Sequence, residues 1–100
     1  MPRFLIITPT FPGPGRARKL ESAIASVQSQ LFKDHLHIVV GDGPTPDARD
    51  ICKRTKTEYA ELPAKVEGFN WGCPCRNYAL DHYDGERCLF LDDDNLPFLP

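Results

Sequence analysis

This sequence of 100 residues lacks the signals of several common protein classes. Its net charge is −2, so no basic footprint for nucleic acid is present. No apolar run approaches the length of a transmembrane segment, and the short run after Arg3 breaks at Thr8-Pro9, which makes a poor signal peptide. We expect one domain, residues 1–100, with no nucleic-acid partner and no membrane span.

Cysteine is also scarce, and its spacing excludes a zinc site. Cys73-Pro74-Cys75 is a C-x-C, and no second pair or nearby His completes a tetrahedral set. Two of the four cysteines sit in apolar segments, where cysteine acts as a small hydrophobic residue. We therefore interpret all four as free thiols of a cytoplasmic protein.

What is present is an alternation of strand and helix patterns. Helical spacing predicts a first helix over about 18–30. A second is expected to begin with Pro46 in its first turn after Thr45, and a third with Pro74 in its first turn. The buried side of the third helix is predicted to carry Cys75, Ala79, Leu80 and Tyr83. Short apolar or β-branched runs predict strands at Phe4–Thr8, Leu36–Val40, Glu58–Leu62 and Cys88–Leu91. The order βαβαβ–loop–αβ predicts an α/β fold of three layers around a parallel, Rossmann-like sheet.

The last predicted strand, an apolar run of the kind buried on both faces, ends in three carboxylates, Asp92, Asp93 and Asp94. Clustered carboxylates repel one another and resist desolvation, so a bound cation, a raised pKa or full solvation is needed. Oxygen ligands of this kind suit Mg²⁺ or Mn²⁺. The alternative is a solvated acidic turn that holds no ligand.

Polar residues gather where the predicted strands end, which is the edge at which open α/β sheets bind ligands. This edge collects Thr8 to Phe11, Asp42 and the acidic triplet, with Arg76 in the first turn of the third helix. Neither a G-x-x-x-x-G-K-[ST] loop nor a G-x-G-x-x-G is present, so a metal bridge is the more plausible holder of phosphates. The inventory predicts a site for a nucleoside diphosphate bridged by a cation.

Structural alternatives stay open for each of these residues. Asp42 is also a good turn former beside Gly43, and Thr8 and Thr10 are as readily structural. Arg76 has Asp81 and Glu67 as possible surface partners. Trp71 is interpreted as a packing residue, and the three histidines as surface or half-buried residues: His35, His37 and His82.

Four stretches in the same order resemble family 2 glycosyltransferases, which have the GT-A fold. Gly41 stands where the family's Asp-Asp-Gly turn has its first Asp, and Cys75 stands where its Gly-x-x-Ala-Arg-Asn segment has Ala. The last stretch resembles the strand that carries the D-x-D motif. The matching stretches are Ile6–Phe11, Ile38–Gly43, Gly72–Asn77 and Phe90–Asn95. The chain thus resembles the N-terminal, nucleotide-sugar-binding half of an inverting glycosyltransferase.

The resemblance implies a role for each matched position. Asp42 would accept a hydrogen bond from uracil or another base, and Arg76 would contact the base or the diphosphate. Asp92 would lie near the ribose and a metal-bound water, Asp94 would ligate Mn²⁺ or Mg²⁺, and Asp93 would replace either in a shifted register. The nucleoside pocket would be lined by Thr8, Pro9 and Thr10. The expected partner is a nucleoside-diphosphate sugar, most simply a UDP-sugar.

Catalysis is harder to place in this sequence. In the family, the acceptor site and the general base lie in the C-terminal half, so an incomplete domain is expected here. The alternative function is a nucleotide- or metal-binding half-domain that needs another segment or chain for turnover. A sugar-phosphate nucleotidyltransferase is a weaker match, since its Gly-rich signature after the first strand is absent. An open sheet edge and the apolar Leu96, Phe98 and Leu99 also predict self-association.

Overall fold

The computed structural model describes residues 3–13, 15–30, 33–64 and 73–92. It contains a four-stranded parallel sheet with strand order β3-β2-β1-β4. The elements in chain order are β1 (Phe4–Thr10), α1 (Arg16–Gln28), β2 (His35–Gly41), α2 (Pro46–Thr55), β3 (Glu58–Glu61), α3 (Cys73–His82) and β4 (Arg87–Phe90). The predicted α/β fold and its element order are confirmed.

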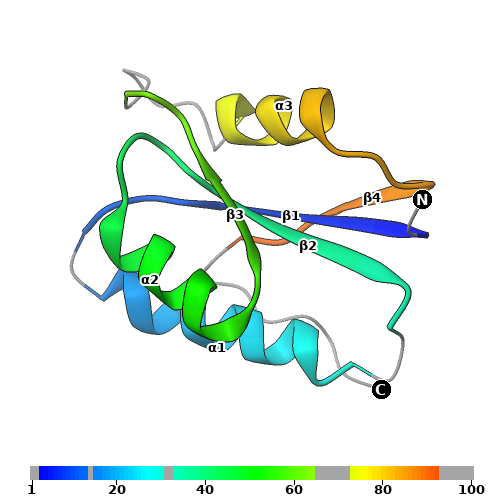
Figure 1. Ribbon diagram of the computed structural model, residues 1–100, viewed down its shortest axis with the longest axis horizontal. Coiled ribbons are helices and arrows are strands. Elements are labelled where there is room, and N and C mark those ends of the chain that lie inside the picture. The colour runs from blue at the N-terminus through cyan, green and yellow to red at the C-terminus, as the bar shows by residue number, and fades with distance from the viewer. Residues whose placement is uncertain (1–2, 14, 31–32, 65–72, 93–100) are drawn as a thin grey trace.

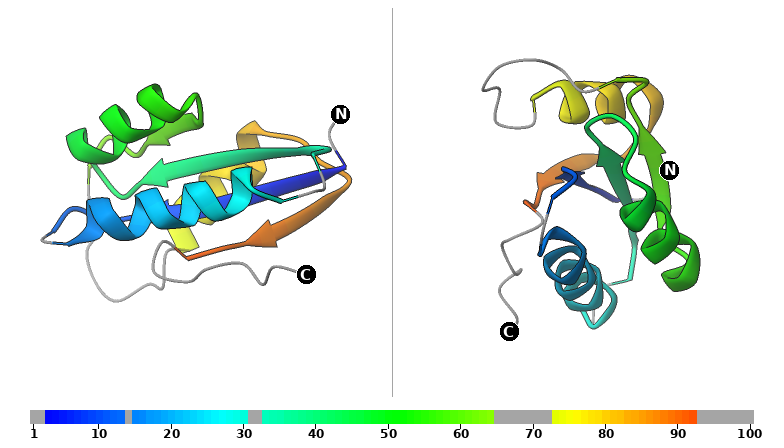
Figure 2. Two further views of the ribbon diagram at one scale, coloured as in Figure 1. Left: turned by 90° about the horizontal axis from the view of Figure 1, so that it is seen from below. Right: turned by 90° about the vertical axis from the view of Figure 1, so that its left-hand side faces the viewer.

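Two helices cover one face of the sheet and one covers the other. Figure 1 shows α3 on one side of the strands and α1 with α2 on the opposite side, and the right-hand view of Figure 2 shows these three layers end on. Alternate residues of a strand point to opposite faces, so neighbours such as Ile38 and Val39 enter different cores. Ile38 packs with Cys75 and Ala79 of α3, whereas Val39 packs with α1 and α2.

The central strand β1 runs two residues beyond its predicted end at Thr8, through Pro9 to Thr10. Proline has no N–H and normally interrupts a central strand. The backbone carbonyl of Ile7 accepts a hydrogen bond from the N–H of Leu91, on the β4 side of β1. Backbone groups two residues apart in a strand face the same neighbour, so the backbone nitrogen of Pro9 also faces β4. Because β4 ends at Phe90, opposite Ile7, the missing N–H costs no ladder bond.

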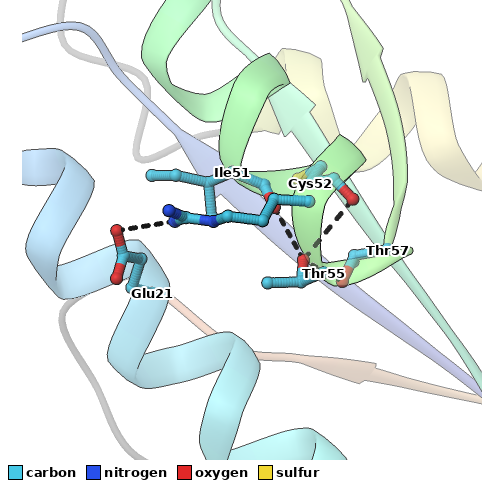
Figure 3. Close-up of polar contacts among 6 residues, drawn as sticks. Glu21, Ile51, Cys52, Thr55 and Thr57 are labelled. Atoms are coloured by element: carbon cyan, nitrogen blue, oxygen red, sulfur yellow. Dashed lines mark hydrogen bonds and ion pairs between the residues drawn. The ribbon is translucent and has the colours of Figure 1, made fainter.

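Helices α1 and α2 lie side by side on their face of the sheet. Helix α1 begins at Arg16, two residues earlier than predicted, directly after Gly15. Helix α2 has the predicted Pro46 at its start, although Thr45 makes no side-chain capping bond. Arg54 Nη2 donates to Glu21 Oε1 across the two helices at 2.9 Å, beside the Thr55 hydroxyl that closes the end of α2 (Figure 3). The Arg54–Glu21 pair thus links the two helices of this layer.

The prediction that the last strand is buried on both faces is wrong. Strand β4 lies at the edge of the sheet, and all four of its residues are exposed, with Leu89 at 48% and Phe90 at 54%. The long apolar run identified a strand correctly, but α3 packs mainly on β1 and β2. The predicted burial of Leu80 is likewise wrong, since its exposure is 44%. No helix in the described ranges is long and apolar enough to cross a membrane.

Candidate functional site

The turn after β2 places Asp42 at the carboxyl edge of the sheet. Its backbone N–H donates to the carbonyl of Thr10 at 2.9 Å, which ties the ends of β1 and β2 together. Gly43 has a φ of 85°, a conformation that favours glycine, so the chain can turn sharply at this point. Asp42 is only 3% exposed. This carboxylate is therefore a fixed part of the edge.

The first turn of α3 lies close to Asp42. Burial raises the pKa of the Cys75 thiol to about 12, and the negative charge of Asp42 acts in the same direction while Arg76 opposes it. Both charged groups are thus near enough to Cys75 to act on it through space. Asp42 and Arg76, two predicted site residues far apart in the sequence, thus both act on the same buried thiol.

Arg76 also joins α3 to the segment after β4. Its Nη2 donates to Asp92 Oδ1 at 2.9 Å, and its guanidinium carbon lies 5.4 Å from the centre of the Phe90 ring. This ion pair differs from the predicted surface alternatives, Asp81 and Glu67, the second of which lies outside the described residues. Two predicted site residues, Arg76 and Asp92, therefore form an ion pair, and Arg76 and Asp42 both act electrostatically on Cys75. The predicted Asp93 and Asp94 lie outside the described residues, as does Trp71.

The three β1 residues expected to line the pocket are fully buried: Thr8, Pro9 and Thr10. The hydroxyl of Thr8 lies 2.8 Å from His37 Nε2, within the layer covered by α1 and α2. His37 is 7% exposed, so its expected surface or half-buried position is wrong. Burial, aided by the neighbouring His35, lowers the pKa of His37 to about 4. These β1 residues form the floor of the edge.

A small cavity at the same edge adds Arg16, which the sequence did not single out for the site. Its volume is about 60 Å³, and it lies between the loop after β1 and the starts of α1 and α2. Its lining includes Phe11, Arg16 and Thr45, and the Arg16 guanidinium lies 5.6 Å from the centre of the Phe11 ring. The Pro- and Gly-rich loop gave no sign that it would bring Arg16 back over Phe11.

The residues of the edge fit a hard cation in their chemistry. Asp92 offers carboxylate oxygen of the type that Mg²⁺ and Mn²⁺ prefer. Among the described residues, no group of three or more His, Cys, Asp or Glu side chains is arranged to hold a metal ion. A complete ligand set therefore has to draw on residues beyond Asp92, for which Asp94 is the sequence candidate.

The fold of this chain matches that of GT-A glycosyltransferases of known structure. No family model matches the chain. A curated relative is the GalNAc(5)-diNAcBac-PP-undecaprenol beta-1,3-glucosyltransferase of Campylobacter jejuni, 33% identical over 100 residues, a match that covers 95% of this chain and 30% of that protein. The resemblance to the N-terminal half-domain of a glycosyltransferase is confirmed by this relative and by the structures below.

Two solved structures illustrate the likeness in fold. TarS 1–349 of S. aureus superposes with a TM-score of 0.78 at 25% identity, covering 94% of this chain and 28% of TarS 1–349. TarS has been solved with UDP-GlcNAc. The mannosyltransferase PcManGT of Pyrobaculum calidifontis, solved with GDP-Man and Mn²⁺, superposes with a TM-score of 0.73 at 22% identity, covering 95% of this chain and 28% of PcManGT. The chain thus spans less than a third of each of these proteins.

Proposed function

We propose that this chain binds a nucleoside-diphosphate sugar, most simply a UDP-sugar, at the carboxyl edge of its sheet. The observation that carries the proposal is the Arg76–Asp92 ion pair between α3 and the segment after β4, close to Cys75, on which Asp42 also acts electrostatically. This ion pair and Asp42 lie where open α/β sheets take ligands, beyond the carboxyl ends of the strands. The UDP-GlcNAc and GDP-Man complexes of the structural neighbours support the ligand class.

Each residue has a physical task in this proposal. Asp42 accepts a hydrogen bond from the base, over the floor formed by Thr8, Pro9 and Thr10. Arg76 contacts the base or the diphosphate, and its guanidinium suits phosphate oxygens in a two-pronged geometry. If Arg76 exchanged Asp92 for the ligand as its partner, the Asp92 carboxylate would be free to contact the ribose and the metal.

A divalent cation, Mn²⁺ or Mg²⁺, completes the proposed site. Asp94 and Asp92 are the ligands we propose, with Asp93 as the substitute in a shifted register. When bound, such a cation would neutralise charge on the departing nucleoside diphosphate in an inverting transfer. The chain's own residues would hold the nucleotide and orient it over the edge.

Calorimetric titration of UDP into this chain tests the proposal, first with Mn²⁺ and then with a chelator. We expect binding that requires the metal and that Asp94→Asn abolishes. Asp50→Asn is the matched control, because it removes the same charge from an exposed position of α2. Absence of binding by the folded chain, with or without metal, would overturn the proposal.

A second function is donor binding without turnover. It is favoured by coverage, since the chain matches 30% of the curated relative and 28% of TarS 1–349. In that case another segment or chain supplies the acceptor site and the general base that an inverting displacement needs. Hydrolysis or transfer from a UDP-sugar by the chain alone would exclude this second function.

A further inference from the structure

The position of Gly41 leaves room for another side chain to reach the turn. A Cβ built on Gly41 would lie 2.6 Å from the hydroxyl oxygen of Tyr59 and 2.9 Å from the hydroxyl oxygen of Thr45. Contacts this short are not found for real Cβ atoms, so any larger residue at position 41 must displace one of these hydroxyls. Tyr59 therefore fills the space of the side chain that Gly41 lacks.

The sheet register explains how Tyr59 arrives there. Strand β3 pairs with β2 in parallel, with Tyr59 opposite Val39 and Glu61 opposite Gly41. Paired residues of parallel strands point to the same face, so Tyr59 lies on the face covered by α1 and α2 and reaches along it toward Gly41. It packs against the same core as Val39.

The Tyr59 hydroxyl is held by two acceptors at the turn. It lies 2.9 Å from Glu61 Oε1 and 3.3 Å from the carbonyl oxygen of Thr45, so its single hydrogen points chiefly at the carboxylate. Burial and the Glu61 carboxylate raise the pKa of Tyr59, which keeps the phenol protonated as a donor. The Thr45 hydroxyl in turn donates to the carbonyl of Gly43 at 3.0 Å. The hydroxyls of Tyr59 and Thr45 thus lie against Gly41, and the Thr45 hydroxyl is bonded directly to Gly43.

We propose that Tyr59 is a positioning residue that fixes the Gly41–Gly43 turn and, through it, Asp42. The proposal rests on the proposed function where it concerns nucleotide binding, and it adds a residue from β3 to the site. It also gives a reason for the departure at position 41 from the turn of the resembling family. An acidic side chain there and the Tyr59 hydroxyl compete for one volume.

Hydrogen exchange tests the positioning role without any ligand. The amides of Asp42 and Leu62 report on the turn, because they donate to Thr10 and Gly41, each at 2.9 Å. We expect Tyr59→Phe, which keeps the ring, to exchange at these amides about five-fold faster or more, as for loss of one ordinary hydrogen bond. Unchanged exchange at both amides would overturn the proposal.

Tyr83→Phe is the matched control. The Tyr83 hydroxyl donates to Glu58 Oε2 at 3.3 Å, so this variant also removes a tyrosine–glutamate bond to β3, at the other end of the strand. We expect it to leave exchange at Asp42 and Leu62 unchanged. Equal acceleration by both variants would indicate a general loss of stability and would overturn the proposal. Glu61→Gln, which weakens the acceptor and keeps the tyrosine, should reproduce a smaller part of the Tyr59→Phe effect.

Calorimetric titration of UDP with Mn²⁺ then separates this inference from the proposed function. If wild type binds, Tyr59→Phe should raise Kd about five-fold or more, whereas Tyr83→Phe should not. If wild type does not bind but the exchange result holds, the proposed function fails and the structural role of Tyr59 stands. Gly41→Asp, the residue of the resembling family, should weaken binding; equal or tighter binding would contradict the shared-volume argument.

Discussion

The Thr8 hydroxyl lies 2.8 Å from Nε2 of His37 in the layer covered by α1 and α2. His37 is nearly buried there, and its pKa is lowered to about 4 by burial and by His35. The folded chain thus keeps this imidazole neutral at pH values where the unfolded chain protonates it. The buried contact between Thr8 of β1 and His37 of β2 therefore makes the stability of the fold depend on pH.

The free energy of unfolding should fall as the pH drops from about 6.5 to about 4, because the unfolded state binds the extra proton in that window. Stability from this group is full above the unfolded pKa, and about 2 kcal/mol of it should be lost between pH 7 and pH 5. Urea denaturation at both pH values measures the loss. His37→Gln should remove most of the difference, while His82→Gln, at an exposed position, should retain it. An unchanged pH dependence in His37→Gln would contradict this assignment.

Arg76→Met should weaken nucleotide binding at least about ten-fold, because it removes the cation from the edge, while changing stability by less than about 1 kcal/mol. The stability effect is small because the Asp92 side chain is 48% exposed and solvent screens the pair. Arg54→Met is the control, since Arg54 pairs with Glu21 at the same distance, 2.9 Å, away from the edge. Calorimetric titration and urea denaturation report the two effects. Equal loss of affinity in both variants would remove Arg76 from the proposed site.

The four cysteines should divide into two reactive and two inert thiols. Cys73 and Cys88 are exposed, whereas burial raises the pKa of both Cys52 and Cys75 to about 12. The thiolate is the reactive form, so we expect the buried pair to alkylate ~1,000-fold more slowly at pH 8. Timed iodoacetamide labelling with mass spectrometry measures each site. Rapid labelling of Cys75 in the folded chain would show that the start of α3 opens readily.

The apolar edge of β4 should promote self-association of this chain. An edge strand offers unpaired backbone groups, and Leu89 and Phe90 add exposed apolar area. We expect the mass measured by light scattering to rise with concentration and Leu89→Lys to suppress the rise, because a charge blunts strand pairing. Leu80→Lys changes an equally exposed leucine on α3 and should have no such effect. A wild-type mass that stays monomeric at every concentration would rule out the edge as a contact.

Much of the fold follows from local patterns in the sequence. The periodicity of Leu20, Ile24 and Val27 was enough to find α1, and Pro46 was enough to find the start of α2. Patterns of this kind describe an element by itself. They do not tell where a strand stands in its sheet, which is why the apolar β4 was wrongly expected to be buried on both faces.

The candidate site was harder to predict where it depends on pairing between strands. The positions of Asp42 and Arg76 followed from the rule that ligands bind beyond the carboxyl ends of strands. The contact between Tyr59 and the turn at Gly41 depends on the β2–β3 register, which the weak pattern of Glu58–Leu62 could not fix. The buried state of His37 depends on the helices that cover its face, and no local pattern distinguishes it from His35.

The strand order has a consequence for the way this chain assembles. The first 61 residues already contain three adjacent strands and both helices of one layer. Strand β4, by contrast, pairs with β1 although the two strands are far apart in the sequence. Pairing between distant segments is slow to form. Nascent chains should therefore acquire the α1–α2 layer on the ribosome before the Arg76–Asp92 contact exists. The Arg76–Asp92 contact would then form only after the α1–α2 layer, and a chain stalled before residue 87 would lack strand β4.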